Sequence, residues 1–308
     1  MQQAELLLCV SETDLFAGYA PSGRHNQKGT SESAMNNEIK LVAIDLDGTL
    51  LNSRHALSAR NRRAIESAQQ QGVEVVLATG KTRHAAEDLI DSLGIDSPGI
   101  YMQGLITYNA DGSVRTRIVM AKESVSRVIS LGEEFGFGAL VYSDNRTFAP
   151  RVDDFAIKMT EYGEPHVETV AAWPQLLDSF DINKVVLYGE EDQVAALRGA
   201  LDARLAGAVH VTRANVDGMI EVLPPNTSKG GAVKTLLEEL GIDPSNALAA
   251  GDGENDIEML QAVGIGVAMG NATQMLKDVA DVIVPNNDED GVAIALEEFV
   301  LGEEAVQK

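Results

Sequence analysis

Apolar runs and amphipathic stretches alternate regularly over two separate parts of the chain. In the first part, three mainly apolar runs predict buried strands, and the two stretches between them have the spacing of helices. Ser58 and Thr82 can cap these helices, and Gly72 and Gly94 can end them. The strands are expected at residues 40–46, 73–78 and 100–103, and the helices at 58–71 and 82–93. This order predicts a parallel sheet with right-handed crossovers.

The middle of the chain has a different pattern. Residues 106–109 and 114–119 are typical of a β-hairpin around Ala110-Asp111-Gly112. A mixed region follows, with a helix expected near residues 123–135 and strands near 139–142 and 184–188. From Ile220 onward the parallel pattern is expected to resume. Its strands are predicted at residues 247–250, 266–268 and 282–284, and its helices at 228–240, 256–263, 272–280 and 292–300.

The simplest architecture is an α/β fold in which a doubly wound parallel-sheet core is interrupted by an inserted α+β domain. The core is expected at residues 37–119 and 220–304, and the inserted domain at 120–219, an ordinary size for a small domain. Residues 1–36 are expected to form a flexible tail, because residues 22–33 are rich in Gly, Ser, Asn and Gln.

Composition and charge exclude several classes of protein. The 308 residues carry a net charge of −23, which argues against binding of nucleic acid or an anionic membrane, since both require a basic surface. No apolar stretch is long enough to span a bilayer, and the single cysteine, Cys9, rules out an intramolecular disulfide framework. We expect a soluble cytoplasmic protein. Organelle targeting by the tail is the alternative, although Glu5, Glu12 and Asp14 are unusual in a transit peptide.

Two carboxylates follow the first predicted strand in the segment Asp45-Leu46-Asp47-Gly48-Thr49. Ligand sites of open parallel sheets lie at this end of the strands. Residues i and i+2 of a strand share a face, so two like charges lie close together and require a proton or a cation. A magnesium-dependent active site satisfies that requirement. The alternative is an Asx turn in which Asp-Gly merely reverses the chain.

Three further segments are expected at the same edge of the sheet. Thr79 and Gly80 can bind an anion through a hydroxyl and backbone N–H groups. Lys229 begins a helix, where a cation is unfavourable unless it faces a bound anion. In the segment 251–256, Asp252 and Asp256 offer carboxylates to a cation that prefers oxygen ligands. For each of these segments, a helix cap or a surface side chain is the simpler alternative.

Together, Asp-Leu-Asp-Gly-Thr at residues 45–49, Thr79, Lys229 and Gly-Asp-Gly-Glu-Asn-Asp at 251–256 strongly resemble the motifs of the haloacid dehalogenase (HAD) superfamily. The resemblance extends over residues 36–301. The position and size of the insertion are similar to those of the Cof-type subfamily IIB. The resemblance implies a Rossmann-like catalytic core and an inserted type C2B cap.

The resemblance also implies a role for each motif residue. Asp45 is the expected nucleophile and forms an aspartyl-phosphate, and Asp47 is the expected general acid and then base. The expected phosphate-binding residues are Thr79, Gly80, Lys229 and Asn255. Mg²⁺ is the expected cofactor, held by Asp45, the backbone carbonyl of Asp47 and Asp252, and Asp256 is expected to bind or orient the waters of the metal.

Two departures from the subfamily pattern concern substrate choice. Lys81 stands where many Cof-type members have arginine, and Gln103-Gly104-Leu105 replaces a frequent Asn-Gly-Ala. Lysine is a point charge, whereas arginine presents a planar fork of donors. These differences leave the motif residues intact. They weaken the inference of any particular substrate from other members of the subfamily.

The expected function is that of a phosphatase for small phosphorylated metabolites such as sugar phosphates, pyridoxal phosphate or riboflavin-pathway phosphates. Asp47 disfavours cleavage of carbon–halogen bonds, because members with that activity need no acid at this position. A phosphomutase that uses the same aspartyl-phosphate is one alternative. A non-catalytic phosphate-sensing switch is another, although Asp47 as a base predicts rapid turnover. The oligomeric state cannot be inferred from the sequence.

Overall fold

A computed structural model describes residues 38–213 and 216–302. The predicted tail, residues 1–36, lies outside the described residues, as does Cys9. Within the described part of the chain, no helix has both the length and the apolar character needed to cross a membrane.

A five-stranded parallel sheet forms the core, in the strand order β14-β13-β12-β1-β2. The strands are β1 (Leu41–Ile44), β2 (Glu74–Leu77), β12 (Ala247–Gly251), β13 (Ile265–Ala268) and β14 (Val282–Ile283). The central strand β1 pairs with β2 on one side and with β12 on the other. The two separate parts of the sequence therefore share one sheet, and the predicted doubly wound α/β core is confirmed.

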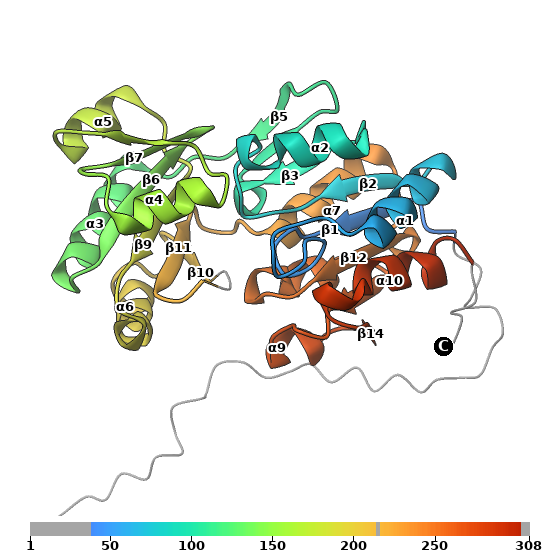
Figure 1. Ribbon diagram of the computed structural model, residues 1–308. Helices are drawn as coiled ribbons and strands as arrows, with labels where there is room; N and C mark the ends of the chain where they lie inside the picture. Colours follow the sequence, from blue (N-terminus) through green and yellow to red (C-terminus); the bar gives the residue numbers. More distant parts are fainter. Residues whose placement is uncertain (1–37, 214–215, 303–308) are drawn as a thin grey trace, which may run out of the picture. The chain divides into compact units, whose positions relative to one another are not determined.

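Helices cover both faces of this sheet. They are α1 (Ala59–Gln70), α2 (Glu87–Leu93), α7 (Lys229–Leu240), α8 (Ile257–Leu260), α9 (Gln274–Lys277) and α10 (Gly291–Phe299). On one face α1 packs beside α10, and α7 lies on the other face (Figure 1). There α7 packs beside α8. Ser58 caps α1 and Gly94 ends α2 in a left-handed conformation, as predicted. The second predicted helix begins differently, with a 3-10 turn at His84–Ala86.

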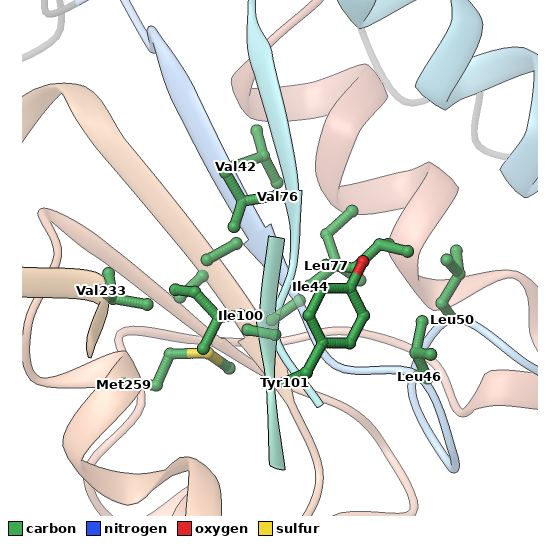
Figure 2. Packing of buried hydrophobic residues seen from close by; sticks show 14 of the residues in the cluster. Val42, Ile44, Leu46, Leu50, Val76, Leu77, Ile100, Tyr101, Val233 and Met259 are labelled. Carbon is green, nitrogen blue, oxygen red and sulfur yellow. The ribbon is translucent and has the colours of Figure 1, made fainter. Parts of the chain in front are cut away.

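The core strands are apolar because both faces of the sheet are covered. Figure 2 shows Val42 and Ile44 of β1 packed with Val76 and Leu77 of β2. Val233 of α7 and Met259 of α8 belong to the same cluster, and these six side chains are at most 1% exposed. This packing holds the carboxyl ends of the strands in fixed positions.

A three-stranded antiparallel sheet follows β2 in the chain. It consists of β3 (Gly99–Tyr101), β4 (Ile106–Tyr108) and β5 (Val114–Arg117). Ile100 also forms a parallel bridge with Ala78, so β3 continues the core beyond β2. The hairpin predicted around Asp111 and Gly112 is confirmed by the pairing of β4 with β5.

The inserted domain, or cap, is built on a six-stranded sheet with the order β10-β11-β9-β6-β7-β8. Its strands are β6 (Gly138–Ser143), β7 (Arg146–Ala149), β8 (Val167–Thr169), β9 (Lys184–Tyr188), β10 (His210–Thr212) and β11 (Met219–Leu223). Its helices are α3 (Lys122–Glu134), α4 (Asp154–Glu161), α5 (Trp173–Ser179) and α6 (Glu191–Arg204). The expected mixture of helices and strands is therefore present.

Side chains alternate between the two faces of the cap sheet, as the period of a strand requires. In β9 and β11, Val185 and Val222 pack into a hydrophobic cluster formed with α3, α5 and α6. The neighbouring residues Lys184, Val186 and Glu221 face the other way and line a cavity. One face of the cap sheet thus stabilises the cap, and the other face is available for function.

One expectation from the sequence is wrong. The apolar pattern predicts that the parallel core resumes at Ile220, but β11 pairs antiparallel with β9 and so belongs to the cap sheet. The reason is that all of β11 is buried, and a strand covered on both faces has the apolar pattern of a parallel-sheet strand. The division into core and cap stays a prediction, and we propose moving the end of the cap from residue 219 to Leu223.

Candidate active site

Asp45 lies directly beyond the carboxyl end of β1. Its backbone N–H donates to the carbonyl of Ala250 at 3.0 Å, which continues the β1–β12 pairing past the last residue of β1. The Asp45 side chain is buried, and only 7% of the residue is exposed. The sheet therefore fixes a carboxylate at the edge where ligands bind in open α/β folds.

Lys229 joins Asp45 to Asp256. Its Nζ lies 2.8 Å from Oδ1 of each carboxylate, and only 1% of the lysine is exposed. Ser228 caps α7 by accepting a hydrogen bond from the N–H of Gly231, so Lys229 is held in the first turn. Burial alone lowers the pKa of Lys229, but the attraction of Asp256 and Asp45 outweighs it and raises the pKa. The ammonium is therefore fully charged.

The segment after β12 holds Asp252 and Asp256 together. Oδ2 of Asp256 accepts hydrogen bonds from the backbone N–H groups of Asp252 and Gly253, both at 3.0 Å. Thr49 donates its hydroxyl to Oδ1 of Asp252 at 3.0 Å. The segment after β1 therefore contacts the segment after β12.

Gly48 permits this close approach. Its φ is +77°, and a Cβ atom there would lie 2.3 Å from Oδ2 of Asp252. A side chain at this position is therefore excluded both by backbone conformation and by space.

Three buried carboxylates gather at this point. Asp45, Asp252 and Asp256 each offer an oxygen within 4.8 Å of the others. Burial raises the pKa of Asp45 well above its usual range; Lys229 opposes this effect, and Asp256 and Asp252 add to it. Hard divalent cations prefer oxygen ligands, and the three buried carboxylates are a donor set of this kind. The residues present therefore fit Mg²⁺.

Asp47 is held by two basic side chains. Its Oδ1 lies 3.0 Å from Nζ of Lys81 and 3.2 Å from Nδ1 of His55. Lys81 also donates to the backbone carbonyl of Tyr162, in the cap, at 3.1 Å. The ring of His55 lies edge-on to that of Tyr162, with centroids 5.0 Å apart. Asp47 is thus oriented by groups that themselves contact the cap.

A cavity of about 500 Å³ lies over these groups. Asp45, Asp47, Thr79 and Gly80 line it from the core, together with Asp252 and Asn255. The cap contributes both apolar and ionisable side chains: Tyr142, Met159, Tyr162, Glu164, Lys184, Val186, Val216, Met219 and Glu221. The cavity can hold a small organic molecule whose anionic end faces Asp45 and whose remainder contacts the cap.

The model of one protein family, the haloacid dehalogenase-like hydrolases, matches residues 42–296. The chain belongs to the haloacid dehalogenase-like hydrolases. The match includes all the site residues described above, both in the core and in the cap, and confirms the resemblance inferred from the motifs. This HAD-like hydrolase is therefore an enzyme by family.

Individual relatives agree with this assignment. A Bacillus subtilis 5-amino-6-(5-phospho-D-ribitylamino)uracil phosphatase is 31% identical over 86% of this chain and 97% of its own length. An Arabidopsis thaliana chloroplastic endoribonuclease YBEY is 38% identical over 83% of the chain, but the match spans only 45% of that protein. A solved sugar phosphatase of HAD subclass IIB has the same fold, with a TM-score of 0.74 at 22% identity over 84% of this chain and 98% of that one.

All the site residues named from the sequence gather around this one cavity of the HAD-like hydrolase. Asp45, Asp47, Thr79, Gly80, Asp252 and Asn255 line it. Of the described site residues, Lys229 and Asp256 alone do not line it. Lys229 contacts the lining residue Asp45, and Asp256 accepts a hydrogen bond from the lining residue Asp252. The individual roles of these residues stay predictions.

The motifs of the sequence do not identify the cap residues that line the cavity. Lys184 and Glu221 are ionisable side chains within otherwise apolar strands, and this pattern is the signal that points to them. Of the polar and aromatic side chains at residues 142–148, only Tyr142 is among the described residues that line the cavity. His55, which has no metal-site spacing in the sequence, contacts Asp47.

Proposed function

We propose that this HAD-like hydrolase is a magnesium-dependent phosphatase of small phosphorylated metabolites that forms an aspartyl-phosphate on Asp45. The observation that carries the proposal is the buried cluster of Asp45, Lys229, Asp252 and Asp256 beside a cavity lined by core and cap. A carboxylate held beside an ammonium and facing a cavity can act as a nucleophile toward a bound anion.

In the first half-reaction, a carboxylate oxygen of Asp45 attacks phosphorus and the bond from phosphorus to the ester oxygen breaks. Asp47 gives its proton to the departing alkoxide, which leaves as an alcohol. Thr79, Gly80 and Asn255 line the cavity, and the hydroxyl, the backbone N–H and the amide of these residues would bind the phosphoryl oxygens. Lys229 orients Asp45 and balances part of the negative charge.

In the second half-reaction, water attacks the phosphorus of the aspartyl-phosphate. Asp47, now ionised, takes a proton from that water, and the bond from phosphorus to Asp45 breaks. Inorganic phosphate leaves and Asp45 is regenerated. The contacts of Asp47 with Lys81 and His55 support this role, because they would orient its carboxylate for both proton transfers.

The carboxylates of Asp45 and Asp252 would hold Mg²⁺ together with the backbone carbonyl of Asp47. Both oxygens of Asp256 already accept hydrogen bonds, which favours an orienting role over direct ligation. When bound, Mg²⁺ would neutralise negative charge on the phosphoryl group and on Asp45.

The substrate class rests on the cavity and on the relatives. A cavity of about 500 Å³ covered by the cap favours metabolites over phosphoproteins. One relative is named as a 5-amino-6-(5-phospho-D-ribitylamino)uracil phosphatase and another as a sugar phosphatase. Phosphates of these two classes and pyridoxal phosphate form the first panel. A cytoplasmic location remains a prediction, with organelle targeting as the alternative; a relative is named chloroplastic.

The test is release of inorganic phosphate from this panel, with and without Mg²⁺, by the wild type and by Asp45→Asn. We expect release that requires Mg²⁺ and is lost in the variant, because the amide is a poor nucleophile. Covalent phosphoenzyme in Asp45→Asn would refute the role of Asp45. Transfer to a second hydroxyl without release would indicate a mutase, and stoichiometric labelling without turnover would indicate a switch.

A further inference from the structure

Three consecutive core residues each make a polar contact with the cap. We call Gly80, Lys81 and Thr82 the 80–82 loop; it follows Thr79 directly. The Gly80 carbonyl accepts from Nζ of Lys184 at 2.8 Å, and Lys81 donates to the carbonyl of Tyr162 at 3.1 Å. Thr82 donates its hydroxyl to Glu164 at 2.9 Å. The conformation of a loop in the proposed phosphate-binding region therefore depends on the cap.

The Lys184 side chain also begins a second connection to the core. Its Nζ lies 2.9 Å from Oε1 of Glu221, and Oε2 of Glu221 accepts from the amide of Gln103 at 2.5 Å. Gln103 in turn accepts from the Asn255 amide at 3.0 Å. A continuous hydrogen-bonded chain thus runs from Gly80 through two cap residues to Asn255.

Gln103 also packs directly on the 80–82 loop. A Cβ atom on Gly80 would lie 2.5 Å from Nε2 of Gln103, so the amide occupies the space that this glycine leaves. The two core groups at the ends of the chain, Gly80 and Asn255, both line the cavity. The Lys184–Glu221 pair therefore acts on both sides of the proposed phosphate-binding site.

The ion pair is buried where the cap meets the core. Lys184 and Glu221 are only 2% and 3% exposed, and burial of an ion pair costs desolvation that an apolar pair avoids. Their same-face neighbours Val186 and Met219 are apolar. Both charged groups use their remaining hydrogen bonds on core atoms, which assigns the pair to the contact between cap and core.

We propose that Lys184 and Glu221 are positioning residues: when the cap is closed on the core, they complete the phosphate-binding site by fixing the 80–82 loop and the Gln103–Asn255 pair. This inference rests on the proposed phosphatase function. With the cap open, the Gly80 carbonyl and the Gln103 amide lose these partners, so bound phosphate meets a complete site only after closure.

The test replaces the pair by apolar residues of similar size, Lys184→Met with Glu221→Leu. Such a replacement of a buried ion pair usually preserves folding. The matched control is Arg146→Met with Glu168→Leu, which removes an ion pair lying entirely within the cap, on β7 and β8. In a third protein, Gln103→Asn, the core side chain that donates to Glu221 is shorter and the cap is unchanged. Asparagine tolerates the positive φ of position 103.

The first readout is hydrogen exchange of the full chain without substrate, over residues 79–84 and 99–105. We expect exchange about 10-fold faster or more in the double variant and in Gln103→Asn, and no change in the control. Unchanged exchange in both would overturn the proposal. Because exchange requires no turnover, this result is independent of whether the wild type releases phosphate, which tests the proposed function separately.

The second readout is steady-state hydrolysis of the preferred panel member and of acetyl phosphate, which is too small to reach the cap side of the cavity. Misplaced phosphate-binding groups should lower kcat about 10- to 100-fold for both substrates, with little change in KM. A loss confined to KM of the larger substrate would overturn the proposal, because it would show that the pair binds the leaving group instead.

Discussion

The ammonium of Lys81 lies 3.0 Å from Oδ1 of Asp47, the expected general acid and base. The same ammonium donates to the carbonyl of Tyr162 in the cap. We expect Lys81→Met to lower kcat for alkyl phosphates about 10- to 100-fold, because Asp47 loses a group that orients it. This loss is part of the rate enhancement that general acid–base catalysis usually gives. Phenolic leaving groups need less protonation, so aryl phosphates should lose much less. Comparison of kcat for the two ester classes measures the difference.

Two controls accompany this prediction. Lys81→Arg introduces the residue common in the subfamily and should retain most activity, whereas Lys234→Met removes an exposed lysine of α7 and should change nothing. Equal losses for alkyl and aryl esters in Lys81→Met would show that Lys81 does not act through the leaving-group proton.

Lys229→Met should destabilise the protein, because Asp45 and Asp256 then lose their shared buried cation. Breaking a buried ion pair by removing one partner costs about 3–5 kcal/mol. Urea unfolding at neutral pH without Mg²⁺ measures this loss, and saturating Mg²⁺ should recover part of it. An unfolding free energy equal to that of the wild type would contradict the assignment of Lys229 as the neutralising cation.

Gly48→Ala should remove the stabilisation that Mg²⁺ gives the protein, because the new Cβ displaces the Asp252 carboxylate. The left-handed backbone itself costs roughly 1–3 kcal/mol for a residue other than glycine. Gly72→Ala is the matched control, since Gly72 has a φ of +82° and a Cβ atom added there would meet nothing within 4 Å. The shift in Tm on adding Mg²⁺ should vanish in Gly48→Ala and persist in Gly72→Ala.

Glu164→Gln should change the pH dependence of stability. Burial raises the pKa of Glu164 above its ordinary value of 4.5, and Lys184, Thr82 and Lys81 only partly offset this effect. A raised pKa means that the folded protein binds the proton more tightly, so wild-type stability from this group is present below pH 4.5 and is lost as pH rises through the folded-state pKa. The amide does not titrate. The Tm of Glu164→Gln minus that of the wild type should therefore increase from about pH 4 to about pH 7, and a constant difference would refute the buried-acid assignment.

The core site was predictable from the sequence because its residues occupy places that the fold fixes. Asp45 and Asp252 directly follow buried parallel strands, and Lys229 lies in the first turn of a helix. The carboxyl ends of parallel strands meet at one edge of the sheet, so the positions of these residues in their elements were sufficient to bring them together.

The cap site could not be predicted in the same way. Which side chains of β9 and β11 face the cavity depends on strand pairing between segments far apart in sequence. A one-residue slip in that register would reverse the faces of Lys184 and Glu221. The apolar character of β11 also concealed its antiparallel pairing, since both of its faces are buried.

The pairing of β1 with β12 has a consequence for how the protein is made. Thr49 and Asp252 are 203 positions apart, and every residue of the cap lies between them. The cap sheet contains only residues up to Leu223, so all its strands leave the ribosome before β12 does. A nascent chain stopped just after the cap would carry Asp45 and Asp47 but neither Lys229 nor Asp252. Catalytic competence therefore arises late in translation, after the domain that covers the site has been synthesised.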